Sequence, residues 1–176
     1  MSLPAQKFRE LLFQLLYSHD IGEAQEAHIT PLLMRELSVT KRNVALAYQR
    51  MREIAKRLPE IDSLIAATSL EYRFERIPCV ERNVLRVGVY ELLYDPEIPA
   101  KVAIAEAMRL AKKFSTRESS QFINALLDAI YKQKSGAAVH TEELHSSTQI
   151  LLEAEATTSN IEVVPESESN ETAEEL

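Results

Sequence analysis

The fold is decided by residues 80–128, which read VERNVLRVGVYELLYDPEIPAKVAIAEAMRLAKKFSTRESSQFINALLD. The first part, roughly residues 80–94, is apolar on almost every side and leaves only a narrow polar strip. A helix with this pattern is usually central, with other helices packed around it. Gly88 lies inside it at a cost of about 1 kcal/mol relative to alanine. This glycine indicates that a neighbouring helix approaches the backbone closely.

Two amphipathic helices are predicted after the central one. The turn at residues 95–99 contains two prolines, which cannot continue a helix. Apolar residues then recur at three-and-four spacing over residues 103–114, which predicts a helix of about four turns. Ser115 and Glu118 have the spacing of a capping box, so the next helix should begin near Thr116. Its expected buried residues are Phe122, Ile123, Leu126, Leu127 and Ile130.

Four further helices are predicted ahead of this block. They are expected over residues 5–19, from Thr30 with Pro31 in its first turn, over residues 40–58, and from Pro59 through Thr68. Pro78 separates the last of them from the central helix, and a soft division falls over residues 70–78. No strand pattern competes with these helices. The sequence therefore predicts an all-α fold, a compact bundle of about seven helices in two helical halves.

The charge of the chain is divided unevenly. Of the 176 residues, 45% are apolar and only three are glycine, enough to bury one sizeable core. The formal charge is −7, but residues 135–176 contain ten of the 27 acidic residues, all Glu, and no Lys or Arg. Residues 1–134 hold all 20 basic residues against the other 17 acidic ones, about +3. We expect a helical RNA-binding domain over 1–134 and a disordered acidic tail over 135–176, because such a tail buries too little apolar surface. Within the tail, residues 150–156 could form a transient helix.

Several classes of protein are excluded by the composition. The single cysteine, Cys79, cannot form an intramolecular disulfide, and the four histidines show no spacing typical of zinc. No apolar run approaches a membrane span and no signal-peptide pattern is present, so a cytoplasmic protein without membrane contact is expected. No catalytic residue is expected, because no nucleophile with a positioned base is visible. We likewise expect no metal, cofactor or small-molecule substrate.

The junction between the last two predicted helices gathers Lys112, Lys113, Arg117 and Ser119. Cations beside the unpaired amides of a helix start are the two ingredients of a phosphate-binding surface. Ordinary helix capping produces the same pattern. The residues of this junction alone leave both interpretations open.

On the first helix, Lys7, Arg9 and Tyr17 are not needed for the core. Cations beside an exposed aromatic ring suit single-stranded RNA, because the charge holds a phosphate and the ring stacks on an unpaired base. Two cations alone do not establish RNA binding.

Four segments together resemble the NusB family of transcription antitermination proteins. VERNVLRVGVYELL resembles the family's central helix, IPAKVAIAEAMRLAKKF its signature stretch, FINALLD the segment that follows, and FRELLFQLLYS its basic first helix. The resemblance implies an all-helical, non-enzymatic adaptor that pairs with NusE, a small-subunit ribosomal protein. It further implies binding to boxA, a single-stranded leader element of ribosomal RNA transcripts, within a complex that helps RNA polymerase pass terminators.

The resemblance also implies which residues act, and that the first helix and the junction are neighbours in space. The implied RNA surface comprises Lys7, Arg9, Tyr17, Lys112, Lys113, Arg117, Glu118, Ser119 and Phe122. The implied NusE surface comprises Glu75, Glu81, Arg82 and Glu91. The chain departs from the family in its sparsely basic first helix, so fewer phosphate contacts are expected. It also has Ala105 for a usual Asn, Ala125 for a usual Gly, and Tyr72 where Trp is frequent.

Two other functions are compatible with a helical fold of this kind. A helical protein-protein scaffold would have no affinity for RNA even with NusE present. Similar helical domains also precede RNA methyltransferases, but such an enzyme needs a glycine-rich cofactor turn, which the three separated glycines do not supply. The acidic tail is outside the family pattern, and competition between this tail and RNA for Lys112 is a further hypothesis.

Overall fold

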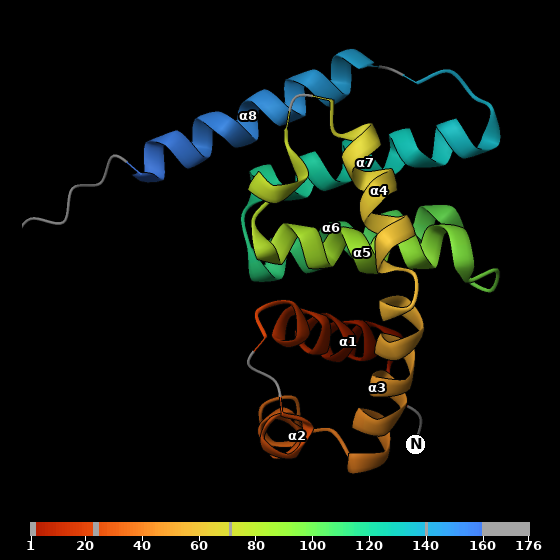
Figure 1. Ribbon diagram of the computed structural model, residues 1–176, viewed down its shortest axis with the longest axis vertical. Helices are drawn as coiled ribbons and strands as arrows, with labels where there is room; N and C mark the ends of the chain where they lie inside the picture. Colours follow the sequence, from red (N-terminus) through yellow and green to blue (C-terminus); the bar gives the residue numbers. More distant parts are fainter. Residues whose placement is uncertain (1–2, 23–24, 71, 140, 160–176) are drawn as a thin grey trace, which may run out of the picture.

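The computed structural model describes residues 3–22, 25–70, 72–139 and 141–159, which form helices and the turns between them (Figure 1). The α-helices are α1 (Ala5–Asp20), α2 (Glu26–Glu36), α3 (Lys41–Ala55), α4 (Leu58–Thr68), α5 (Cys79–Tyr94), α6 (Ala100–Phe114), α7 (Arg117–Ser135) and α8 (Thr141–Ser159), with a short 3-10 helix η1 (Phe74–Arg76) before α5. The predicted all-α class is confirmed.

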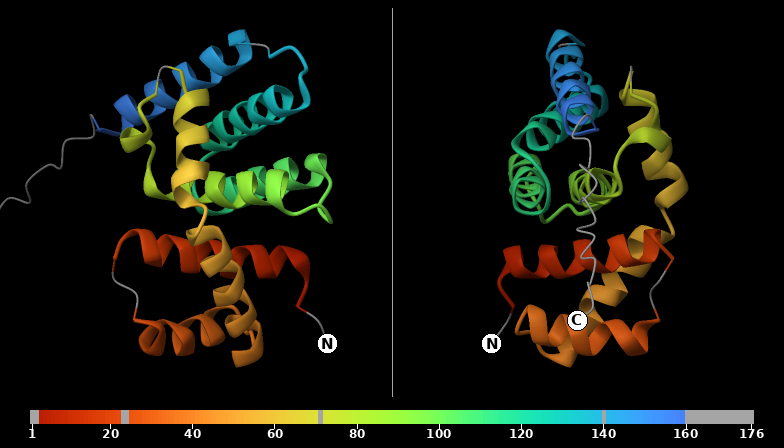
Figure 2. Two further views of the ribbon diagram at one scale, coloured as in Figure 1. Left: turned by 45° about the vertical axis from the view of Figure 1, so that its right-hand side comes forward. Right: turned by 90° about the vertical axis from the view of Figure 1, so that its left-hand side faces the viewer.

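The helices form two halves stacked on one another. Helices α1, α2 and α3 make one half, and α4 to α8 make the other (Figure 2). α5 contacts α1 and α3 on one side and α4, α6 and α7 on the other, so it is the central helix that its pattern predicted. The bundle of about seven helices in two halves is confirmed, and α8 is an additional element. The predicted division over residues 70–78 is wrong, because α4 packs on α5 and α7 and the halves divide between α3 and α4.

Gly88 lets two helices approach the backbone of α5. A Cβ atom added to this residue would lie 2.8 Å from Leu127 Cδ1 on α7 and 3.3 Å from Ala107 Cβ on α6. Both neighbours are fully buried, so neither has open space into which to move. The predicted close approach at Gly88 is confirmed.

Two predicted helix boundaries in the first half are wrong. α2 begins at Glu26 rather than Thr30, because the amides of His28 and Ile29 already bond to the Gln25 carbonyl and start the helix upstream. Pro31 therefore lies inside α2, where it lacks the amide hydrogen bond of a helix interior. The helix expected over 40–58 ends at Ala55, and α4 starts at Leu58 with proline in its first turn.

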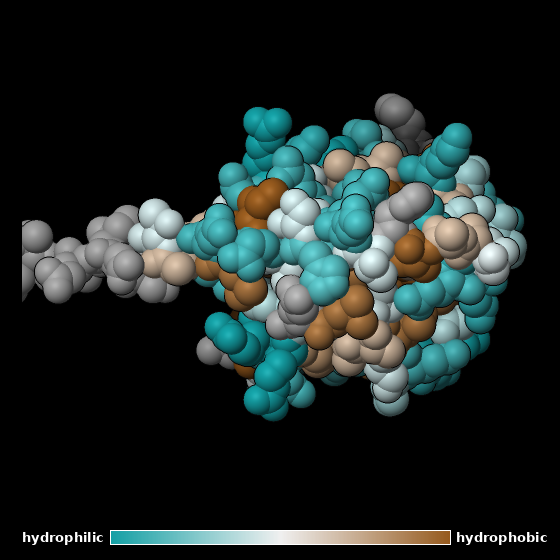
Figure 3. Space-filling model, turned by 90° about the horizontal axis from the view of Figure 1, so that it is seen from above, coloured by the Kyte–Doolittle hydropathy of each residue, from teal (hydrophilic) through white to brown (hydrophobic). Residues whose placement is uncertain are grey.

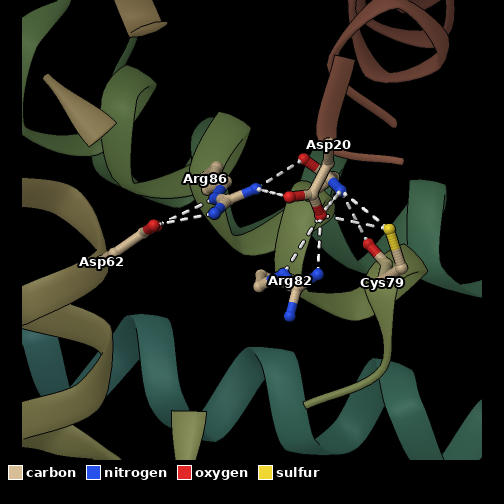
Figure 4. A network of polar contacts seen from close by, with 6 residues as sticks. Asp20, Asp62, Cys79, Arg82 and Arg86 are labelled. Atoms are coloured by element: carbon tan, nitrogen blue, oxygen red, sulfur yellow. Dashed lines mark hydrogen bonds and ion pairs between the residues drawn. The ribbon is translucent and has the colours of Figure 1, made fainter. Parts of the chain in front are cut away.

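A partly buried polar network ties the end of α1 to α4 and α5 (Figure 4). Asp20 accepts hydrogen bonds from Arg82 at 2.8 Å and from Asn83 at 2.9 Å, and it pairs with Arg86 at 3.1 Å. Arg86 continues to Asp62 on α4 at 2.7 Å. Burial opposes the charge on Asp20, but the hydrogen bonds from Arg82, Cys79 and Arg86 outweigh it and hold its pKa well below the usual range. The network fixes how the two halves meet.

The predicted disordered tail is corrected for part of its length. α8 packs against α7 through a buried face of Leu144, Thr148 and Leu151, which recur at helical spacing. Residues 160–176 of the predicted tail lie outside the described residues. The surface on the α8 side mixes small hydrophilic and hydrophobic patches (Figure 3). Within the described part of the chain, no helix has the length and apolar character needed to span a bilayer.

Candidate nucleic-acid interface

Ion pairs hold α1 beside α6. Glu10 on α1 binds Arg109 at 2.7 Å and Lys113 at 2.6 Å, both from α6. Arg109 also donates to the Gln6 carbonyl at 3.1 Å. The structure therefore brings together the first helix and the α6–α7 junction, the two stretches that the sequence nominated separately.

Glu10 is ionised because its two cations stabilise the carboxylate. Its burial alone would raise the pKa, but the hydrogen bonds from Lys113 and Arg109 dominate and lower it. Lys113 remains 49% exposed on its outer side, so its ammonium group is shared between Glu10 and solvent. It is consequently a weaker anion site than an unpaired surface lysine.

Arg9 and Glu91 face inward and bind each other, which corrects both predicted roles. The Arg9 Nε atom donates to the two carboxylate oxygens of Glu91 at 2.8 and 3.0 Å. The two side chains are only 8% and 7% exposed. Burial raises the pKa of Glu91, although the charge of Arg9 opposes that rise. In this arrangement Arg9 does not reach RNA and Glu91 does not reach NusE, because the pair fastens α1 to α5.

Glu81 and Ser119 are likewise internal partners. Glu81 on α5 is buried and accepts hydrogen bonds from the hydroxyls of Ser115 and Ser119, the latter at 2.5 Å. The predicted cap is also corrected: Thr116 caps α7 by accepting the Ser119 amide at 3.1 Å, and Ser115 ends α6. The Ser115 hydroxyl instead donates to Glu81. A direct RNA contact by Ser119 and a direct NusE contact by Glu81 do not fit this conformation.

Phe122 belongs to the core rather than to the surface. It is fully buried, and its ring meets that of Tyr72 edge-on with centroids 5.8 Å apart. Its predicted contact with RNA is therefore corrected. The sequence had separately predicted Phe122 as a buried residue of this helix, and that prediction is confirmed.

The remaining predicted RNA residues lie at the surface. Lys112 and Arg117 are exposed, and Lys7, Tyr17 and Glu118 are partly exposed. Neither Lys112 nor Arg117 forms an ion pair with any described residue. These two side chains are thus available to an external anion.

The predicted NusE residues fall into two groups. Glu75 on η1 is well exposed and makes only a long 3.8 Å contact with Arg73. Arg82 is 21% exposed and is engaged by Asp20. Of the four predicted NusE residues, only Glu75 presents an unobstructed charge.

An aromatic hollow of about 290 Å³ lies between α1, the start of α5 and the end of α6. Phe13 packs between Phe114 and Tyr17, with ring centroids 4.7 and 6.1 Å away. The lining residues are Phe13, Gln14, Tyr17, Ser18, Val80 and Phe114. The sequence pattern placed Phe114 among the apolar residues of its helix and did not indicate that it lines this hollow. Its position directly after Lys112 and Lys113 could have indicated that role.

A second hollow of about 500 Å³ adjoins the first, since Val80 lines both. It is bounded by the start of α5, the α6–α7 junction and the last turns of α8. The surface thus runs from the aromatic hollow past the junction to α8. The two hollows are lined mainly by apolar groups, and the α6–α7 junction between them also carries the exposed cations Lys112 and Arg117. Apolar surface near exposed cations suits a flat ring carrying a phosphate.

Comparison with known sequences places this architecture in a family. The sequence model described as the NusB family matches residues 6–132. The chain belongs to the NusB family.

Similar proteins agree with this assignment. The transcription antitermination protein NusB of Chlamydia pneumoniae is 37% identical over 132 residues, which cover 75% of this chain and 82% of that protein. The solved structure of T. maritima NusB is 30% identical with a TM-score of 0.64, covering 82% of this chain and 99% of that one. A crystal structure of the antitermination factors NusB and NusE in complex with dsRNA is 26% identical with a TM-score of 0.62, covering 73% of this chain and 96% of that one.

Proposed function

We propose that this chain is a transcription antitermination factor that pairs with NusE and binds boxA-type single-stranded leader RNA of ribosomal RNA operons. In the RNA polymerase antitermination complex it would help the enzyme read through terminators. The observation that carries the proposal is the aromatic hollow between α1 and the end of α6, next to an α6–α7 junction that carries the exposed, unpaired cations Lys112 and Arg117. A similar NusB occurs with NusE and RNA in a solved complex, which supports the two classes of partner.

The exposed residues would bind the bases and the phosphates of a single strand separately. Tyr17 offers a ring at the edge of the hollow for an unpaired base, a stacking contact worth about 1–3 kcal/mol per base. Lys7, Lys112 and Arg117 would hold phosphates. Because Arg9 is committed to Glu91 and Lys113 to Glu10, few cations remain and binding by the chain alone should be weak.

NusE would strengthen binding by adding its own contacts to the strand. We place its docking surface at the approach to α5, where Glu75 projects a carboxylate into solvent. An exposed charge of this kind steers a basic partner and fixes its orientation more than it adds affinity.

The small number of unpaired cations also favours a second candidate, a helical scaffold that binds NusE without touching RNA. Titration of a boxA-like RNA with the chain, with and without NusE and across a salt series, separates the two. The adaptor predicts weak binding alone and clear strengthening by NusE. The scaffold predicts no affinity of the chain for RNA and no strengthening beyond NusE itself.

The same titration tests the residues. Replacing both Lys112 and Arg117 by Ala should flatten the plot of log affinity against log salt by about 0.7 for each lost contact to a single strand. The matched control replaces two other exposed cations, Arg42 on α3 and Lys56 directly after it, and should leave that slope unchanged. Equal slopes for the two double variants would remove the α6–α7 junction from the RNA surface.

A further inference from the structure

α8 is an addition to the part of the chain that matches the NusB family. The match ends at residue 132, inside α7, and α8 begins at Thr141. α8 is held by its buried face on α7 and by the Tyr72 hydroxyl, which donates to Glu155. The helix is therefore docked, and the point at which it ends is fixed.

The lengths of α7 and α8 decide where that point lies. Both helices have 19 residues, about 28 Å each, and they run antiparallel (Figure 1). The last turns of α8 therefore pass the start of α7, and the end of α8 projects beyond it. The second hollow confirms this placement, because Thr116 and Ser119 line it together with Leu151 and Glu155.

The chain that follows α8 is strongly acidic. Residues 160–176 contain six Glu and no Lys, Arg or Asp. The start of α7, which the last turns of α8 pass, carries Arg117, and Lys112 lies at the end of the preceding helix. Both cations are exposed without an ion pair to any described residue, so they are available to carboxylates from the following chain.

Reach does not limit a contact between them. Seventeen extended residues span up to about 58 Å, far more than the separation of neighbouring helices. A short tether of this kind gives an effective concentration on the order of 1 mM. At that concentration even a weak electrostatic contact is formed in most molecules.

We propose that residues 160–176 dock on the cationic junction formed by Lys112, Lys113 and Arg117 and compete there with the phosphates of RNA. The docking itself does not depend on the proposed function, whereas the competition rests on it. The contact would make the chain its own inhibitor at low salt. RNA binding strengthened by NusE would displace it.

The test compares two variants with the same change in charge. The first replaces the terminal glutamates by Gln at positions 162, 166, 168, 171, 174 and 175. The control replaces six exposed glutamates elsewhere, Glu26, Glu36, Glu60, Glu97, Glu142 and Glu143. Both are read as full-length proteins by NMR without RNA, and then by titration of boxA-like RNA in the presence of NusE.

Docking predicts that, in low salt, the amide signals of Lys112, Thr116 and Arg117 move in the terminal variant and not in the control, and that the difference vanishes in high salt. Unchanged signals in the terminal variant would overturn the docking. Competition predicts that the terminal variant binds RNA about tenfold more tightly than the control does. This factor is the ratio of the effective concentration of about 1 mM to a dissociation constant of about 0.1 mM for the contact of the tail. Equal RNA affinities of the two variants would overturn competition. If neither variant nor the unmodified chain bound RNA, the proposed function would be overturned instead, and the NMR result alone would decide whether the tail docks.

Discussion

The Tyr72 hydroxyl donates hydrogen bonds to both carboxylate oxygens of Glu155, at 2.8 and 2.7 Å, and so joins the segment before η1 to the last helix. Burial and the neighbouring carboxylate raise the pKa of Tyr72, which keeps the hydroxyl protonated and able to donate. The tyrosine ring meanwhile packs edge-on against Phe122. One residue therefore connects the core of the bundle to the helix outside the family match.

The variant Tyr72→Phe should release the end of α8 without disturbing the core, because it removes only the hydroxyl. The hydrogen bond joins a buried donor to a charged acceptor, so its loss should cost about 1.5–3 kcal/mol locally, towards the lower end because Glu155 is only partly buried. Hydrogen-deuterium exchange should accelerate over residues 150–157 and not over α5. The exposed Tyr131→Phe is the control, and equal exchange in both variants would show that the contact does not hold α8.

Arg9→Ala should destabilise the fold, whereas Lys7→Ala should leave it nearly unchanged. Removing Arg9 strands the buried carboxylate of Glu91, at a cost of about 3–5 kcal/mol for one partner of a buried pair. Lys7 is partly exposed and has no ion pair with a described residue, so its loss should matter only for RNA. Urea unfolding followed by circular dichroism measures both. Similar midpoints for the two variants would contradict the internal role of Arg9.

Gly88→Ala should lower stability despite the better helix propensity of alanine. The gain in propensity is about 1 kcal/mol, but the new methyl group would lie 2.8 Å from Leu127 Cδ1 in a filled core, and overpacking typically costs about 1–3 kcal/mol. The net loss should appear as a lower urea midpoint. Pairing the change with Leu127→Ala should recover part of the overpacking loss, and strictly additive effects would argue against a clash at this position.

The helices were predictable because each carries its own periodic pattern and punctuation. Gly88 is an example in which one residue indicated both the central position of α5 and the approach of its neighbours. The start of α2 was not predictable. Thr30 and Pro31 have the pattern of a helix start, but the upstream hydrogen bonds to Gln25 begin the helix earlier. Only a transient helix over residues 150–156 was expected in place of α8, because its three buried residues stabilise a longer helix only when α7 is present to receive them.

The candidate site was predictable in location but not in detail. Charge and capping nominated α1 and the α6–α7 junction, and Glu10 does link them. The sequence did not reveal that Arg9 turns inward, because an arginine on a helix looks the same whether its partner is a phosphate or a carboxylate 82 positions away. Side-chain direction at such positions depends on tertiary contacts that periodicity does not encode.

Acid should weaken the junction between the two halves through Asp20. Its pKa is lower in the folded chain than its ordinary value of 3.8, so the unfolded chain binds the proton more readily. The stabilisation from this group is therefore fully present above about pH 4 and is lost as the pH falls from there toward the folded pKa. Glu10, whose pKa is also lowered, contributes with the same sign.

Asp20→Asn isolates the part of the acid sensitivity that belongs to this network. The variant should be less stable than the unmodified chain at pH 7, because Arg82 and Arg86 lose a charged acceptor. Its free energy of unfolding should then fall less steeply below pH 4, so that the two curves converge in acid. Urea unfolding between pH 7 and pH 3 measures this, with the exposed Glu97→Gln expected to follow the unmodified chain throughout. Parallel curves for Asp20→Asn and the unmodified chain would show that Asp20 titrates alike in the folded and unfolded states, contrary to the geometry of the network.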